Sequence, residues 1–161
     1  MNIGILSDTH GNLSAVQRAA RFFQQEEVGA IFLCGDIGGV DLLSVLAGDA
    51  PVHAVLGNVD MYSADWRFFS ENVGVHLHGR FGDIELEGRR IALLHSDDKR
   101  RFYETVSSGK YGLVFSGHTH IVHDYTEGET RCINPGSAGR GNPQTCAILD
   151  LGTDQLKIIE L

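Results

Sequence analysis

Seven residues with metal-binding side chains follow short apolar runs in this chain of 161 residues. They are Asp8, His10, Asp36, Asn58, His95, His118 and His120. Each apolar run is typical of a buried strand, and open α/β sheets hold ligands just beyond the carboxyl ends of their strands. Four imidazoles, with carboxylate and amide oxygens and no thiolate, suit one or two divalent ions. The set therefore predicts a metal-dependent hydrolase.

Each member of this set also has a structural alternative when it is taken alone. Asp8 and Asp36 are residue types typical of helix N-caps and turns, and Asn58 is typical of an Asx turn. Residues two apart on an extended chain, however, project to the same side, so that Asp8 and His10 can converge on one ion. The repetition of such groups at five strand ends favours metal binding.

The glycine that precedes His118 and His120 gives the backbone the freedom to turn both rings towards one centre. The other histidines of interest lie in strand-like runs, and we expect structural or surface roles for them: His53, His76, His78 and His123. The aromatic cluster of Trp66, Phe68 and Phe69 is expected in the core, with a pocket wall or a subunit contact as alternatives.

The bulk composition limits the class of partner. A formal net charge of −8 argues against binding of nucleic acid or of an anionic membrane by the bare surface. Two divalent ions would reverse the sign locally, so a phosphate-bearing substrate stays compatible with an acidic chain. Three cysteines without a CxxC pair predict buried free thiols, which fits a reducing, cytoplasmic compartment. We expect neither a signal peptide nor a membrane span.

The elements that must position these groups alternate between strand and helix in the first sixty residues. Strands are expected at 2–6, 30–34 and 52–56. One helix is expected to begin near Asn12 or Ser14 and to end at Gly29, and another to cover 40–46. This βαβαβ order predicts a parallel sheet with right-handed crossovers.

The second half changes to a mainly β pattern. Short strands are expected over 75–94 around a turn at 87–90, followed by a helix that Asp97 or Asp98 caps and that runs to about Ser107. Further strands are expected at 112–115, 121–126, 130–133, 145–151 and 155–160. Together the two halves predict two mixed sheets packed face to face with helices outside, in one domain over residues 1–161.

The ordered motifs DxH, GD, GN, H and GHxH resemble those of the calcineurin-like metallophosphoesterases. The segments Ser7–Asn12 and Asn134–Ser137 are similar to those of the short bacterial and archaeal phosphodiesterase branch of that superfamily. The resemblance covers residues 2 to about 150. It implies a four-layer α/β/β/α sandwich, with two metal ions at the ends of the central strands.

The resemblance also implies how the ions are held and what they do. One ion would be bound by Asp8, His10, Asp36 and His120, and the other by Asp36, Asn58, His95 and His118. Asp36 would bridge them. Manganese is expected first, with iron, zinc or nickel as alternatives. A hydroxide bridging both ions would then attack the phosphorus of a small phosphodiester.

Several positions depart from the branch or extend its pattern. Val59 stands where many larger members have a histidine that protonates the leaving group or contacts phosphate, so esters with poor leaving groups are expected to react slowly. Asp60 is expected to orient His10. Asp97 is expected to contact a metal-bound water or to cap a helix. Asn12 is expected to touch phosphate. With Asp36 and His95, the residues Asp60 and Asp97 complete the candidate catalytic set.

Two other functions remain open at this level. The small subunit of the retromer coat has the fold that the resemblance implies and acts mainly as a protein-binding scaffold, which the valine at position 59 and an apolar patch over 66–69 would favour. A phosphomonoesterase is the other alternative. The branch often forms dimers or tetramers, so a homo-oligomer is expected.

Overall fold

The computed structural model describes residues 1–48, 50–61 and 63–161 of the chain. Strands and helices alternate at first, and the second half is mainly β, as the sequence pattern predicts. In chain order the elements are β1 (Asn2–Leu6), α1 (Leu13–Gln25), β2 (Ala30–Leu33), α2 (Leu42–Leu46), β3 (Val52–Ala54), α3 (Ala64–Val73), β4 (Val75–Leu77), β5 (Phe81–Leu86), β6 (Arg89–Leu94), α4 (Lys99–Ser107), β7 (Leu113–Phe115), β8 (Val122–Glu127), β9 (Thr130–Pro135), β10 (Thr145–Asp150) and β11 (Leu156–Glu160).

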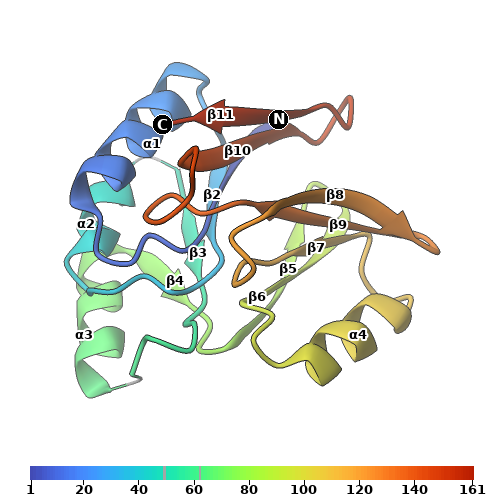
Figure 1. The fold of residues 1–161 in the computed structure, drawn as a ribbon, viewed down its shortest axis with the longest axis horizontal. Helices are drawn as coiled ribbons and strands as arrows, with labels where there is room; N and C mark the ends of the chain where they lie inside the picture. Colours follow the sequence, from blue (N-terminus) through green and yellow to red (C-terminus); the bar gives the residue numbers. More distant parts are fainter. Residues whose placement is uncertain (49, 62) are drawn as a thin grey trace.

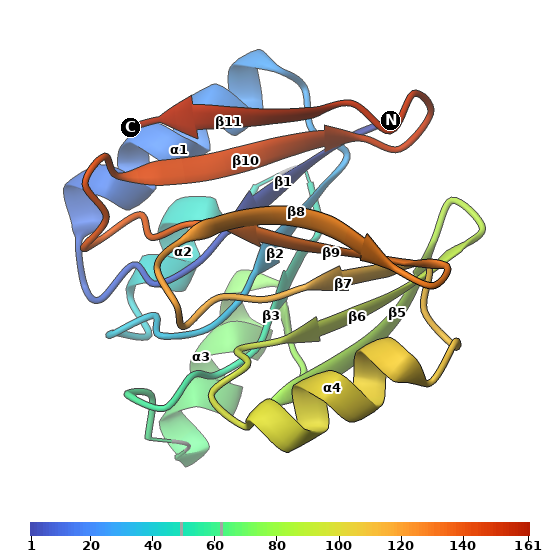
Figure 2. The ribbon, with the colours of Figure 1, turned by 45° about the vertical axis from the view of Figure 1, so that its right-hand side comes forward.

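These elements form four layers, with two β-sheets facing each other and helices on the outside (Figure 1, Figure 2). Helices α1, α2 and α3 cover the outer face of the six-stranded sheet, and α4 covers the outer face of the five-stranded sheet. The expected α/β/β/α sandwich of two mixed sheets is thereby confirmed. No helix in the described ranges combines the length and the apolar composition needed to cross a bilayer.

The strand sequences divide their side chains between the layers because successive residues point to opposite faces of a sheet. In β1, Ile5 enters the core between the two sheets, whereas Leu6 packs under the helices. In β6, Leu93 faces the same inter-sheet core, whereas Leu94 faces α4. Three buried apolar clusters therefore correspond to the three interfaces between the four layers.

The sheet topology sets parallel strand ends beside one another. The six-stranded sheet has the order β11-β10-β1-β2-β3-β4, in which β1 to β4 are parallel and β10 runs antiparallel to β1. The five-stranded sheet has the order β5-β6-β7-β9-β8, in which β6, β7 and β9 are parallel. The carboxyl ends of β1, β2 and β3 thus form one row, and those of β6 and β7 form another.

Helix α3 is an element that the sequence pattern does not predict. Trp66 and Ser70 lie one turn apart on its buried face, whereas Phe68 is 71% exposed. Because two buried residues in ten make a weak helical period, the segment shows little more than a cluster of aromatic residues. The helix ends at Gly74, whose φ of 75° suits a left-handed C-cap.

Several predicted boundaries move by a few residues. Helix α1 ends at Gln25 rather than at Gly29, and α2 begins at Leu42 rather than at 40. The cap of α4 is Asp98, whose side chain accepts a hydrogen bond from the Arg101 backbone N–H at 3.0 Å. The strands at 30 and 52 end before 34 and 56, which leaves the extra residues free to lead into the motif loops.

Candidate metal centre

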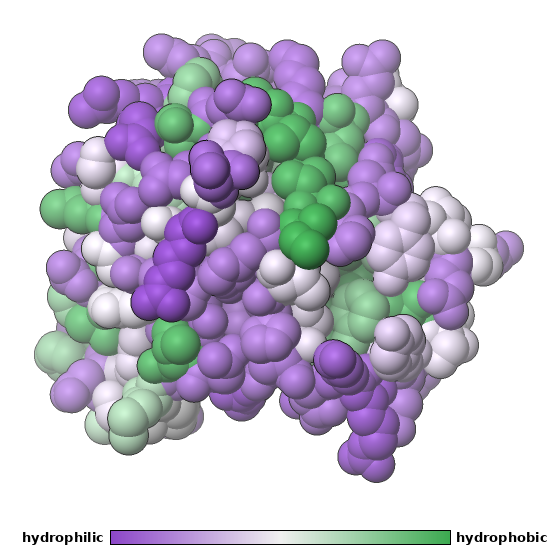
Figure 3. All heavy atoms as spheres, viewed as in Figure 1, coloured by the Kyte–Doolittle hydropathy of each residue, from purple (hydrophilic) through white to green (hydrophobic). Residues whose placement is uncertain are grey.

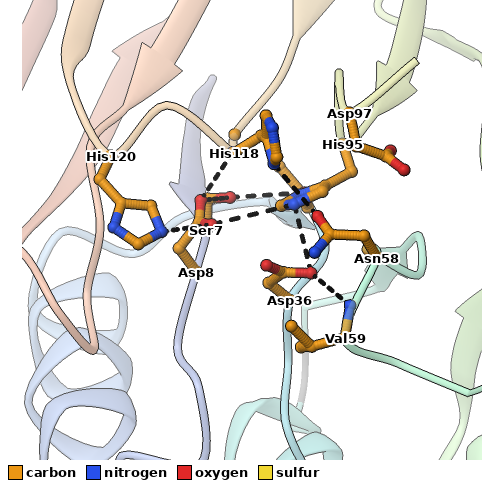
Figure 4. Close-up of polar contacts among 12 residues, drawn as sticks. Ser7, Asp8, Asp36, Asn58, Val59, His95, Asp97, His118 and His120 are labelled. Atoms are coloured by element: carbon orange, nitrogen blue, oxygen red, sulfur yellow. Dashed lines mark hydrogen bonds and ion pairs between the residues drawn. The ribbon is translucent and has the colours of Figure 1, made fainter.

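The seven predicted ligands come from five loops, each of which follows the carboxyl end of a strand. The loop after β1 carries Asp8 and His10, and the loops after β2 and β3 carry Asp36 and Asn58. The facing sheet adds three imidazoles in the loops after β6 and β7, namely His95, His118 and His120. Figure 4 shows that the labelled members of this set point toward one another.

On one side of the centre, two imidazoles lie close to the Asp8 carboxylate. His120 Nε2 lies 3.0 Å from Asp8 Oδ1, and His10 Nε2 lies 3.7 Å from the same oxygen. The two Nε2 atoms are 3.2 Å apart. Asp36 Oδ2 lies 3.8 Å from His10 Nε2. This arrangement has the four donors that the resemblance implies for the first ion.

On the other side, the remaining Asp36 oxygen faces the second sheet. Asp36 Oδ1 lies 3.2 Å from His95 Nε2, and Asp8 Oδ1 lies 4.0 Å from the same nitrogen. Asn58 Oδ1 lies 3.1 Å from His118 Nδ1. Because each oxygen of Asp36 faces a different histidine, its carboxylate stands where a bridging ligand between two ions would be needed.

Two buried atoms at this centre have no hydrogen-bond partner within the described part of the chain. They are Asp8 Oδ1 and His95 Nε2, on side chains that are 0% and 1% exposed. Leaving such atoms unpaired costs about 1–3 kcal/mol each. A divalent ion accepts both a carboxylate oxygen and an imidazole nitrogen, so these unpaired atoms are what a metal centre without its ions would contain.

A hydrogen bond from the other ring nitrogen of His95 fixes the orientation and the tautomer of the imidazole. His95 Nδ1 lies 2.8 Å from the Cys34 carbonyl oxygen. A carbonyl only accepts, so Nδ1 carries the proton and donates it. In the neutral ring the Nε2 lone pair is then free to face the centre, which is the usual arrangement for a metal-binding histidine.

Backbone strain is concentrated at the same residues. Five of the seven candidate ligands have a left-handed φ: Asp8 at 53°, His10 at 45°, Asp36 at 50°, His118 at 70° and His120 at 59°. Non-glycine residues in this region cost free energy and cluster at functional sites. The surrounding structure therefore holds the backbone of these residues in a conformation that they would not adopt on their own.

Two motif glycines give the carboxylates the space they occupy. A Cβ at Gly57 would overlap Asp36 Oδ1, and a Cβ at Gly117 would overlap Ser7 Oγ and lie 2.6 Å from Asp8 Oδ2. Neither position needs a left-handed backbone, so close approach is the reason for glycine at both.

The charges of the centre act on one another. Burial raises the pKa of Asp36, but the His95 imidazole and the Val59 backbone N–H outweigh it, so the pKa of Asp36 lies below its ordinary value. Burial lowers the pKa of His95, but Asp36 and the Cys34 carbonyl outweigh it and raise the pKa. Burial and then the charge of Arg140 lower the pKa of His10.

Of three further candidates, Asp60 and Asp97 have roles that differ from those expected, whereas Asn12 caps α1, as the helix start predicted near Asn12 or Ser14 allows. Asp60 does not orient His10, because its carboxylate instead accepts from the backbone N–H groups of Gly57, Ile37 and Gly38 at 2.9, 3.0 and 2.9 Å. It ties the loop after β3 to the loop after β2, so it positions Asp36 indirectly.

Asn12 and Asp97 are also already engaged. Asn12 is the N-cap of α1, and its Oδ1 accepts from the Ala15 N–H at 3.1 Å. Asp97 forms an ion pair with Arg80 and does not cap α4. Figure 4 shows the Asp97 carboxylate pointing away from Asp8 and Asp36.

Residues that orient the ligands are the part that sequence reasoning missed. Ser7 Oγ donates to Asp8 Oδ2 at 2.6 Å, and the His118 backbone N–H donates to the same oxygen at 3.0 Å. The Val59 backbone N–H donates to Asp36 Oδ1 at 3.0 Å. Ser7 could have been found, because it directly precedes the first ligand in the motif, but the backbone donors leave no signal in residue type.

Comparison with known proteins agrees with the fold. A profile of the calcineurin-like phosphoesterase superfamily domain matches residues 1–154. The chain therefore belongs to the calcineurin-like phosphoesterase superfamily, a class of hydrolases.

Individual members of that class resemble the chain along most of its length. Phosphodiesterase MJ0936 of Methanocaldococcus jannaschii is 26% identical over 138 residues, which cover 84% of this chain and 83% of that protein. A probable metallophosphoesterase of Methanothermobacter thermautotrophicus is 30% identical over 145 residues, covering 85% and 77%. The solved structure of an archaeal phosphodiesterase superposes with a TM-score of 0.91 at 26% identity, covering 100% of both chains.

Proposed function

We propose that this chain is a dinuclear-metal-dependent phosphodiesterase that acts on small phosphoesters. The observation that carries the proposal is the pair of unpaired buried atoms, Asp8 Oδ1 and His95 Nε2, at the meeting point of the carboxylates and imidazoles. The similarity to proteins named phosphodiesterase supports the choice of reaction. Manganese is the first metal to test, and iron, zinc and nickel follow.

The proposed ligand sets follow the geometry of the two sides. Asp8, His10 and His120 would hold one ion, and His95, Asn58 and His118 the other, with Asp36 shared. Bound divalent ions would lower the pKa of a water between them, to give the attacking hydroxide, and would offset charge on the phosphoryl oxygens.

The chain's own residues prepare this centre in two ways. Ser7 and the His118 N–H hold Asp8, and the Val59 N–H holds Asp36, so the ligands need little reorganisation when ions bind. The side chain of Val59 is 46% exposed and has no proton to donate to a leaving group. We therefore expect the enzyme to favour diesters whose leaving group is already a weak base.

A scaffold that only binds proteins has less support. Within the cluster over 66–69, Trp66 is 7% exposed and Phe69 packs against the core, which leaves Phe68 as the exposed aromatic side chain. In Figure 3 the middle of the visible face is mainly hydrophilic, and apolar groups lie in separate patches.

The test is hydrolysis of bis(p-nitrophenyl) phosphate and of p-nitrophenyl phosphate by the chelated protein, with and without added Mn²⁺. We expect manganese-dependent turnover, faster with the diester. The variant Asp36→Ala is expected to lose both metal content, measured by mass spectrometry, and turnover. Asp65→Ala, at an exposed aspartate of α3, is the matched control and is expected to keep both. A metal-loaded wild type without turnover would contradict the proposal.

A further inference from the structure

The loop between β9 and β10 packs directly on the first motif loop. The Ala138 N–H donates to the Ser7 carbonyl at 3.0 Å, and the Gly139 N–H donates to the Asp8 carbonyl at 2.9 Å. Ser137 Oγ also donates to the Asp8 carbonyl, at 3.0 Å. In Figures 1 and 2 this orange-red segment lies beside the blue segment that follows β1. The backbone of the loop thus forms part of the support of the metal centre.

The approach of the two loops is close enough to require glycine. A Cβ at Gly139 would overlap the Thr9 carbonyl oxygen and lie 2.9 Å from the Asp8 carbonyl oxygen. The next residue is also held, because the Arg140 N–H donates to Ser137 Oγ at 3.0 Å. Arg140 therefore starts from a fixed backbone, one residue from the contact with the first motif loop.

The side chain of Arg140 is exposed, and its positive charge belongs to the loop that packs on the first motif loop, which also carries His10. Among the described residues its guanidinium has no hydrogen-bond or ion-pair partner. By contrast, Arg80 is paired with Asp97, and Arg131 with Asp124. The charge of Arg140 is thus available to an anion from solution.

We propose that Arg140 binds a non-bridging phosphoryl oxygen of the substrate, on the His10 side of the centre. This inference rests on the proposed function and adds a substrate-binding residue to it. A guanidinium presents planar donors that match the oxygens of a phosphate. It stays charged in proteins and gives up no proton, so its role is to hold the phosphoryl group and to offset its charge rather than to act as an acid.

The positive charge of Arg140 also affects which class of phosphate ligand binds more strongly. A cation beyond the metal ions attracts a dianionic phosphomonoester or inorganic phosphate more strongly than a monoanionic diester. Phosphate-like ligands should therefore compete with the diester, and Arg140 should set the strength of that competition.

The experiment measures binding of inorganic phosphate to the manganese-loaded protein by calorimetry, together with KM and kcat for the diester. Arg140→Ala is expected to weaken phosphate binding about 10- to 100-fold, the loss of one charge-assisted hydrogen bond. Arg140→Lys is expected to lie between, and added guanidinium ion is expected to restore part of the affinity of Arg140→Ala. The matched control Arg21→Ala removes an exposed arginine of α1 and is expected to bind phosphate as the wild type does.

Each result separates this inference from the proposed function. Wild-type phosphate affinity in Arg140→Ala would overturn the inference even if turnover remains metal-dependent. A loss of bound manganese or of thermal stability in Arg140→Ala, without rescue by guanidinium, would assign the residue to loop folding and also overturn it. Phosphate binding that depends on Arg140 in a wild type without turnover would support the inference and contradict the proposed function.

Discussion

Replacing Asp8 by asparagine should make the metal-free protein more stable while it weakens the metal centre. Asp8 Oδ2 already accepts from Ser7 Oγ and from the His118 N–H, and an amide oxygen can accept both. The other oxygen, Oδ1, is buried without a hydrogen-bond partner in the described structure and lies 3.0 Å from His120 Nε2. An amide nitrogen at that position can donate to the imidazole, so the variant satisfies an atom that the wild type leaves unpaired.

The expected gain in stability of Asp8→Asn comes from the atom at the Oδ1 position. Relief of an unsatisfied buried group contributes about 1–3 kcal/mol, which for a chain of this length corresponds to a rise in Tm of roughly 2–12 °C. The wild type should gain from metal instead. An ion at 1,000 times its Kd stabilises the folded state by about 4.1 kcal/mol, or roughly 8–16 °C, which exceeds the gain of the variant. The order of stability should therefore reverse when Mn²⁺ is added.

The assay is scanning calorimetry of the wild type and Asp8→Asn, each with chelator and then with increasing Mn²⁺. Asp65→Asn, at the exposed position in α3, controls for the change from carboxylate to amide. The reasoning is refuted if the chelated variant unfolds below the chelated wild type. It is equally refuted if manganese raises the Tm of both proteins by the same amount.

Gly117→Ala should lose bound manganese, and its free energy of unfolding should fall by about 1–3 kcal/mol, because the added Cβ would overlap Ser7 Oγ. Metal analysis and denaturant unfolding measure these two losses. Val59→His should speed hydrolysis of alkyl diesters at least about tenfold, and of aryl diesters by less, because the histidine can protonate a poor leaving group. Rates of the wild type and the variant for a series of leaving groups measure the difference. Burial, then His78 and His76, lower the pKa of His53 to about 4. The unfolded chain then binds more protons between pH 6.5 and 4, so stability should fall as pH drops through that window, by about 1–2 kcal/mol for this half-exposed ring. Urea unfolding of the wild type at pH 7 and pH 5 should show this fall in the free energy of unfolding, and the fall should be smaller in His53→Phe.

The fold and the convergence of the candidate ligands were largely open to prediction because they depend on local patterns. Strand periodicity separates residues such as Ile5 and Leu6 between two cores, and each motif residue directly follows such a run. Helix α3 escaped prediction because its buried face amounts to Trp66 and Ser70. Its stability depends on the sheet beneath it rather than on its own pattern.

The partners of the polar side chains were beyond prediction for a different reason. Asp60 and Asp97 are carboxylates beside ligand motifs, and residue type alone does not distinguish a catalytic acid from one that binds backbone N–H groups or an arginine. The contact of Gly139 with the Thr9 carbonyl joins segments about 130 residues apart. Such long-range neighbours depend on the completed packing of both sheets, which no window along the chain contains.

The division of the ligands between the two sheets has a consequence for how the protein matures. Asp8, His10, Asp36 and Asn58 belong to the first sheet, and the three remaining histidines belong to the second. A nascent chain that has emerged only as far as residue 60 carries one of the four candidate imidazole ligands, His10, and cannot enclose a metal pair. Under the proposed function, the ions connect the two sheets, because each sheet supplies part of the ligand set. Metal uptake then reports that the two sheets have packed together. A core change such as Phe115→Ala, which removes packing between the two sheets and replaces no ligand, should then release metal before it unfolds either sheet.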